Sequence, residues 1–146
     1  INSKLLVDIK HVFKNFKLNN FIIIIRINDI IVPFDDLIKS ISLSSVKIYD
    51  FRKHDCCYIG ETEKEILKIL YHCQCKNTNM ALNYIRDLVD SIYIKKTFDC
   101  AKLISESFLA ENIFFQNSIF YLCTNNDTNV INYDFVNKKY INIGVS

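Results

Sequence analysis

The feature that most constrains the fold is an apolar run near the amino terminus that gives way at once to turn-forming residues. Residues Phe21–Ile25 are mostly β-branched, which favours a buried strand, and the polar residues that begin at Arg26 make the run too short to span a membrane. The Asn28-Asp29 pair suits a two-residue turn because both side chains tolerate positive φ. The pattern therefore predicts a β-hairpin with strands over Phe21–Ile25 and Ile30–Val32.

A helix is expected to follow this hairpin. Pro33 is expected to end the second strand, and Asp35 and Asp36 carry side chains of the kind that cap helix starts. Apolar side chains then recur at helical spacing, at Leu37, Ile38 and Ile41. The residues after this helix, Val46–Phe51, fit either a strand or another helical turn.

An amphipathic helix is expected ahead of the hairpin, over Lys4–Phe16. Its apolar stripe must be buried against its own domain or against a partner chain. Because little of the chain lies nearby, we expect the stripe to pack across the two-fold axis of a homodimer. The residues expected in this interface are Leu5, Leu6, Ile9, Val12 and Phe13.

The middle of the chain is expected to hold two short strands around one helix. Residues Cys56–Ile59, closed by Gly60, are typical of a third strand, and His72–Cys75 of a brief edge strand. The helix between them opens at Glu61 with acidic residues that complement its dipole. Its expected core face is Ile66, Leu67, Ile69 and Leu70.

Two further helices are expected after a turn and cap at Asn77–Asn79. The first should bury Met80, Leu82, Ile85, Leu88, Val89 and Ile92, and a break is expected near Ile94–Thr97. The second, over Phe98–Leu109, should bury Cys100, Ala101, Ile104 and Phe108. Helical patterns over Ser118–Thr124 and Val130–Ile141 follow, with a β-hairpin as the rival interpretation of this tail.

Composition narrows the possible functions. The 146 residues are half hydrophobic, which is enough for one compact domain. The 18 basic and 16 acidic residues leave a net charge of +2 without a basic stripe, so nucleic acid is not expected as a partner. Two glycines cannot make a phosphate-binding loop, and none of the three histidines lies in a catalytic motif. An enzyme with a small-molecule substrate is therefore not expected.

The six cysteines are expected to be reduced thiols of a cytosolic protein, since no secretory leader is recognisable. Imidazole and thiolate groups do cluster in the middle of the chain, but without a Cys-x-x-Cys pair, so neither a metal nor a cofactor is expected. The candidate ligands are His54, Cys56, Cys57, His72, Cys73 and Cys75. Adjacent acids such as Asp35 and Asp36 are expected to cap a helix instead of catalysing a reaction.

Three blocks of sequence, taken in order, resemble the BTB/POZ domain. They are Ile31–Ser42, Glu65–Cys73 with its apolar-Tyr ending, and Asn79–Ala101 with a Cys near the start of the closing helix. The tail, with Asn117–Leu122 and Phe135–Ile141, resembles the three-box that opens the BACK region of kelch-like proteins. Together with a composition typical of AT-rich genomes, the resemblance extends to the BTB-kelch proteins of poxviruses.

The resemblance implies an α+β fold in which helices surround a small three-to-five-stranded sheet, with a C-terminal helix pair added. It places a BTB/POZ domain over 1–112 and the three-box over 113–146. It implies a homodimeric, cytoplasmic adaptor, in an infected host cell if viral, that recruits a cullin scaffold of a ubiquitin ligase. It implies no nucleic acid, membrane, metal, cofactor or small-molecule substrate.

The resemblance also assigns a cullin-contacting surface to the helix and loop after the hairpin, the helical hairpin and the three-box, which map to Val46–Lys53, Tyr84–Ile94 and Asn117–Tyr121. The residues so assigned are Ile48, Tyr49, Phe51, Lys53, Tyr84, Asp87, Ser91, Tyr93, Phe120 and Tyr121. Where many cullin-binding members carry an acidic motif, this chain has Phe51-Arg52-Lys53. Two alternatives stay open: a helical Bcl-2-like viral decoy that binds host signalling proteins, and a BTB dimer with a purely structural role.

Overall fold

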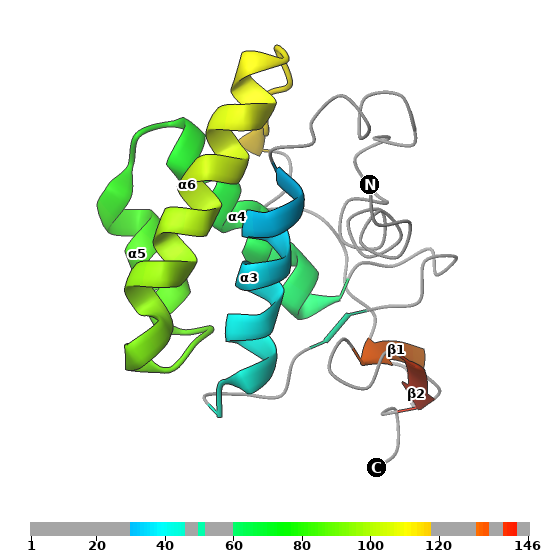
Figure 1. Cartoon of the computed structure of the whole chain (residues 1–146). Coiled ribbons are helices and arrows are strands. Elements are labelled where there is room, and N and C mark those ends of the chain that lie inside the picture. The colour runs from blue at the N-terminus through cyan, green and yellow to red at the C-terminus, as the bar shows by residue number, and fades with distance from the viewer. Residues whose placement is uncertain (1–29, 46–49, 52–59, 118–130, 135–138, 143–146) are drawn as a thin grey trace.

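The computed structural model describes residues 30–45, 50–51, 60–117, 131–134 and 139–142 of the chain (Figure 1). Most of these residues are helical, and their only strands form a two-stranded hairpin. The helices are α3 (Ile31–Leu43), α4 (Glu61–Gln74), α5 (Thr78–Arg86), the short 3-10 helix η3 (Ser91–Tyr93) and α6 (Ile94–Ala110). The strands are β1 (Ile131–Asp134) and β2 (Lys139–Asn142).

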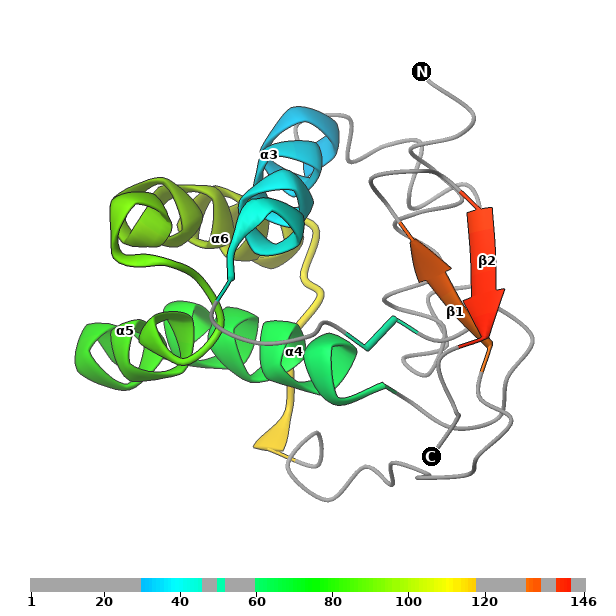
Figure 2. The ribbon, with the colours of Figure 1, turned by 90° about the horizontal axis from the view of Figure 1, so that it is seen from below.

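The helices form two layers. Figure 2 shows α3 and α6 side by side in one layer and α4 and α5 in the other, and α6 also packs against α4. The core lies between the layers, where apolar side chains from every α-helix are removed from water. Its largest fully buried side chains are Phe34, Phe51, Phe108, Ile30, Leu37, Ile66, Leu67, Ile69 and Leu70. Each such burial is worth about 1.5–3 kcal/mol, so this helical core holds the described fold together.

The expected second strand of the hairpin is wrong, because Ile31 and Val32 are the first residues of α3. Pro33 lies in the first turn of this helix, where its missing N–H costs no hydrogen bond. Ile30 is fully buried in the helical core, whereas Val32, in the first turn of α3, is 68% exposed. Asp35 therefore lies inside the helix instead of capping it, where it pairs with Lys39 at 2.9 Å.

The expected α+β fold with a three-to-five-stranded sheet is contradicted: the described residues form helical layers and hold no sheet larger than the β1-β2 hairpin. The second helix of the expected C-terminal pair, over Val130–Ile141, is wrong as well, since β1 and β2 pair antiparallel, with Ile131 opposite Asn142. Residues 131–134 alternate apolar and polar side chains, which is the period of a strand. The rival interpretation of the tail as a β-hairpin is thus confirmed for these residues.

The expected edge strand over His72–Cys75 is also wrong. His72, Cys73 and Gln74 form the last turn of α4, and the helix ends in a Schellman motif. In that motif the Asn77 N–H donates to the His72 carbonyl at 2.9 Å, and the Lys76 N–H donates to the Cys73 carbonyl at 3.2 Å. Lys76 takes the left-handed conformation with φ of 59°. A chain reversal, not a strand, therefore leads into α5.

The predicted helices after this point are largely confirmed. The Asn77 side chain caps α5 by accepting a hydrogen bond from the Met80 N–H at 3.4 Å. The predicted inward face of α6 is buried as expected, at Cys100, Ala101, Ile104 and Phe108. The helix break comes earlier than predicted, since α5 ends at Arg86 and α6 already begins at Ile94. Ile92, expected in the core, is 78% exposed.

The side-chain amide of Gln74 hydrogen-bonds to main-chain groups near the ends of α4 and α6. The Gln74 Nε2 donates to the Ser105 carbonyl at 3.2 Å and to the Ile113 carbonyl at 2.9 Å, and its Oε1 accepts from the Phe115 N–H at 2.8 Å. We call these contacts the Gln74 network. Phe115 is nearly buried, and its ring meets the Phe108 ring edge-on at 5.3 Å between centroids. The network therefore fixes the chain after α6 against the core.

Several predicted elements lie outside the described residues. They are the helix over Lys4–Phe16, the strand over Phe21–Ile25, the strand over Cys56–Ile59 and the helix over Ser118–Thr124. Among the described residues, no helix combines the length and the apolar character that crossing a membrane requires.

Candidate functional site

Two segments far apart in the sequence meet at the end of the helical layers that is lowest in Figure 1. There α3 ends, and the chain from α5 turns through η3 into α6. Both carboxylate oxygens of Asp90 accept hydrogen bonds from the Ser45 N–H, at 3.2 and 3.1 Å. The Asp90 N–H in turn donates to the Ser44 Oγ at 2.9 Å. The end of α3 is therefore tied directly to the residue before η3.

Two large aliphatic side chains flank this tie and face water. Leu43, two residues before Ser45, is 61% exposed, and Ile92, two residues after Asp90, is 78% exposed. We name Leu43, Ser45, Asp90 and Ile92 the α3–η3 surface. Single exposed apolar residues are common on proteins, but here two stand on neighbouring, hydrogen-bonded segments. Exposed apolar side chains of this kind can bury apolar area against a protein.

Four of the predicted cullin-contacting residues lie on α5, η3 and the turn between them. Asp87 and Ser91 are exposed, whereas Tyr84 and Tyr93 are partly buried. Ser91 and Tyr93 belong to η3 and flank Ile92, so they adjoin the α3–η3 surface. Tyr84 is engaged elsewhere: its ring stacks on His72 at 5.6 Å between centroids, and the Lys68 ammonium lies 5.5 Å from its centroid.

Phe51 was expected at the contact surface, but the structure places it in the core, fully buried. The neighbouring Asp50 fixes this segment to the start of α4. Its N–H donates to the Thr62 Oγ1 at 2.6 Å, and its Oδ2 accepts from the Glu61 N–H at 3.0 Å. A buried ring offers no surface to a partner, so the expected role of Phe51 in binding is corrected to one in packing. Ile48, Tyr49, Lys53, Phe120 and Tyr121 lie outside the described residues, as do the dimer residues Leu5, Leu6, Ile9, Val12 and Phe13.

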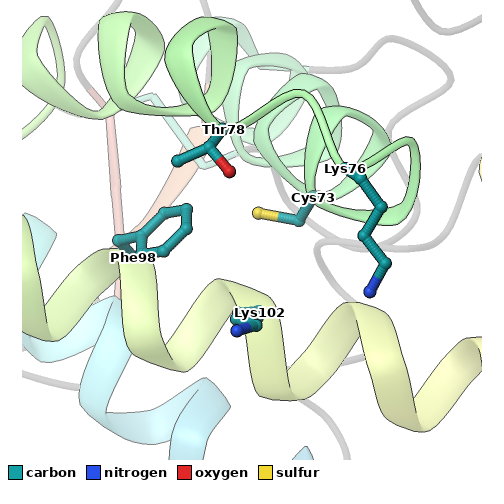
Figure 3. A pocket seen from close by; sticks show the side chains of 5 residues that line it. All are labelled: Cys73, Lys76, Thr78, Phe98 and Lys102. Carbon is teal, nitrogen blue, oxygen red and sulfur yellow. The ribbon is translucent and has the colours of Figure 1, made fainter.

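A small cavity lies between the end of α4, the start of α5 and the middle of α6. It measures about 200 Å³ and is lined by Cys73, Lys76, Thr78, Phe98 and Lys102 (Figure 3). Burial raises the pKa of the Cys73 thiol to about 11, so the thiol is protonated at neutral pH and is a poor nucleophile. Neither imidazole nor carboxylate lines the cavity to act as a general base. Its lining therefore supports packing more than catalysis.

The candidate metal ligands do not converge in the part of the chain that the structure covers. Within it, no three His, Cys, Asp or Glu side chains are grouped to hold an ion. Cys73, Cys75 and Cys100 are free thiols, and burial raises the pKa of Cys100 above its ordinary value. Burial lowers the pKa of His72, which keeps its imidazole neutral. Cys73, Cys100 and His72 thus lie in packing positions, whereas Cys75 is exposed.

Sequence reasoning missed the two residues that define the surface best. Leu43 is the last residue of α3 and lies outside the predicted core face of that helix. Asp90 precedes η3, at a position where Asp is favoured as a cap. That preference predicts a local capping role for Asp90. In the structure its carboxylate instead accepts a hydrogen bond from the Ser45 N–H, 45 positions away. Local sequence carries no signal for that long-range contact.

No protein-family model, curated protein sequence or solved structure matches the chain. The functional interpretation therefore depends on the surface just described and on the sequence patterns. Of these, the α3–η3 surface is the feature that most directly suggests a role.

Proposed function

We propose that the chain is a non-enzymatic adaptor that binds another protein through the α3–η3 surface. One observation carries the proposal: the exposed Leu43 and Ile92 stand on two segments that Asp90 ties together. Burying each aliphatic side chain against a partner is worth about 1.5–3 kcal/mol. A pair of such anchors with a polar rim is typical of the centre of a small protein interface.

The partner class that the sequence resemblance favours is the amino-terminal domain of a cullin scaffold, with the chain acting as a cytoplasmic homodimer. The segments that the resemblance assigns to cullin contact are Val46–Lys53, Tyr84–Ile94 and Asn117–Tyr121, and residues 118–121 lie outside the described residues. Ser45, which directly precedes the first segment, hydrogen-bonds to Asp90 within the second. This proximity supports the proposal, because the end of α3 and the exposed residues of η3 can then contact a single partner. Because Phe51 is buried, other side chains must contact the partner.

The test is calorimetric titration of the chain with a cullin amino-terminal domain. We expect micromolar or tighter binding by the unaltered chain, and at least tenfold weaker binding by Leu43→Asp and Ile92→Asp, because a carboxylate cannot be buried there without a partner. Leu103→Asp is the matched control, since Leu103 is 54% exposed but lies well along α6. The absence of heat at high concentration, or equal binding by all variants, would refute the proposal.

A second candidate is the helical decoy that binds signalling proteins. The observation that favours it is the helical start of α3, which removes the second strand of the expected hairpin. Proteins of that class hold an amphipathic helix in an apolar groove. Titration with an amphipathic helical peptide separates the two: micromolar binding of the peptide, without binding of the cullin domain, would favour the decoy.

A further inference from the structure

The lining of the cavity between α4, α5 and α6 carries positive charge and no negative charge. Its side chains are those of Cys73, Lys76, Thr78, Phe98 and Lys102. Figure 3 shows the Phe98 ring, the Thr78 side chain and the Cys73 sulfur pointing toward one another, with both lysines below Cys73 in this view. Because burial raises the pKa of the Cys73 thiol to about 11, the thiol is neutral near pH 7 and does not repel an anion. The lining therefore has the charge that an anion-binding site requires.

The two lysines of the cavity are weakly paired. Among the described residues, Lys102 belongs to no ion pair, and Lys76 approaches only Glu106, with 4.0 Å between the Lys76 Nζ and the Glu106 Oε1. The side chains of Lys76 and Glu106 are 70% and 47% exposed, so their attraction is weak and is screened by salt. Thr78 is the first residue of α5, where the helix dipole adds partial positive charge. The described carboxylates therefore leave most of the positive charge at the cavity uncompensated.

The volume of the cavity and its apolar wall restrict the ligand further. A volume of about 200 Å³ is enough for a molecule with one six-membered ring. The Phe98 ring and the neutral Cys73 thiol offer an apolar wall, against which a flat ring packs well. The Thr78 hydroxyl and the two ammonium groups are donors that a carboxylate accepts from. These features together fit a ligand that combines a single apolar ring with one carboxylate.

We propose that this cavity binds a small carboxylate built on a single apolar ring, with the ring against Phe98 and the carboxylate toward Lys76 and Lys102. Neither imidazole nor carboxylate lines the cavity, so the site binds its ligand without transforming it. The site goes beyond the proposed function, because it is formed by α4, α5 and α6 and its occupation requires no protein partner.

Benzoate is the probe for this site, and its binding is followed by NMR titration of the chain. We expect a Kd of about 1 mM or tighter, which is ordinary for a ligand of this size. Benzamide has nearly the same shape without the charge, and acetate has the charge without the ring. Each should bind at least about fivefold more weakly than benzoate. Equal binding of either molecule, or no binding of benzoate at about 10 mM, overturns the proposal.

Charge variants test the roles of the lysines in both directions. Lys76→Gln and Lys102→Gln should each weaken benzoate binding about three- to fivefold. Glu106→Gln should instead tighten it about twofold, because this variant removes the carboxylate that competes for Lys76. Lys96→Gln is the matched control, since Lys96 is exposed on the same helix as Lys102 but does not line the cavity. Unchanged binding by Lys102→Gln, or an equal loss in Lys96→Gln, overturns the proposal.

Thiol labelling locates the bound probe. Benzoate at about twice its Kd should slow the alkylation of Cys73 by iodoacetamide about threefold, because the occupied cavity shields the thiol. The exposed Cys75 does not line the cavity and is the internal control, with both rates measured by mass spectrometry of peptides. Slowing at Cys73 alone supports the proposal. Equal slowing at both thiols, or none at Cys73, places benzoate elsewhere and overturns it.

Discussion

At each end of the helical layers, one hydrogen-bonding side chain links two distant segments. The two side chains differ in their exposure to water. At one end, Gln74 meets main-chain groups of residues 105, 113 and 115 beside the nearly buried Phe115 ring. At the other end, Asp90 meets Ser45 in contact with water. Both side chains join segments more than 30 positions apart.

The difference in burial separates stabilisation from positioning. Removing a partly buried amide takes one hydrogen bond from each of three main-chain groups at sites shielded from water, which is costly. An exposed carboxylate leaves groups that water can satisfy. We therefore expect the Gln74 end to determine whether the helices stay folded, and the Asp90 end to determine what the folded chain presents to a partner.

The largest expected effect is at Gln74. Gln74→Ala removes all three hydrogen bonds of the Gln74 network and should lower the unfolding free energy by about 2–4 kcal/mol, measured by urea denaturation. Asp90→Ala is the comparison variant and should change the unfolding free energy by no more than about 0.5 kcal/mol. Equal losses in the two variants would contradict the division between the two ends.

The next effect is expected at Gly60, which precedes α4. A Cβ at this position would overlap the Asp50 carbonyl and approach the Glu63 Oε1 to 3.0 Å, where that oxygen accepts from the Gly60 N–H. Gly60→Ala should therefore cost about 1–3 kcal/mol of unfolding free energy. Asn79→Ala, at an exposed position in the first turn of α5, is the control and should cost less than about 0.5 kcal/mol.

The Gly60 variant sharpens the comparison because its contacts lie close to the buried Phe51. A thermal or urea midpoint for Gly60→Ala equal to that of the unaltered chain would show that the segment of Asp50 moves aside. In that case the start of α4 tolerates the added methyl group.

The smallest expected effect depends on pH and comes from His72, at the end of α4. Burial lowers the pKa of its imidazole below the ordinary value of 6.5, while it packs between Tyr71 and Tyr84. Below pH 6.5 the unfolded chain takes up a proton before the folded chain does, so the unfolding free energy should fall as pH decreases through this range. The stabilisation is complete above pH 6.5.

Urea denaturation at a series of pH values between 5.5 and about 7.5 measures this effect. His72→Gln removes the titrating group and should flatten the dependence within this window. An equal slope in the variant and the unaltered chain would assign the pH dependence to another group.

Helical spacing alone predicted the parts of the fold that are long and amphipathic. Ile66, Leu67, Ile69 and Leu70 are buried on α4 as expected, because a 14-residue helix repeats its apolar pattern several times. The three residues Ile30–Val32 are too few to show a period, and their β-branched side chains favoured a strand. In the structure Ile30 is buried in the helical core and Val32 is exposed, because the run forms the start of α3 instead of a strand.

The candidate site was less predictable than the fold. The family resemblance assigned Ser91 and Tyr93, on η3, to the contact surface. It also assigned Phe51 to this surface, although Phe51 is buried in the core. Leu43 and Asp90 gain their significance from a contact between segments that no local pattern reveals. Residues that act through their neighbours along the chain can be predicted from sequence, whereas residues that act across the fold require coordinates.

The Gln74 network also has a consequence for how the chain can evolve. Its three partners are main-chain groups, which every residue type offers except proline at a donor position. Substitutions at 105, 113 and 115 can therefore accumulate without removing those groups, whereas the amide at 74 needs both its donor and its acceptor. Among divergent copies of such a chain, we expect the glutamine to persist even where a side chain at 105, 113 or 115 changes.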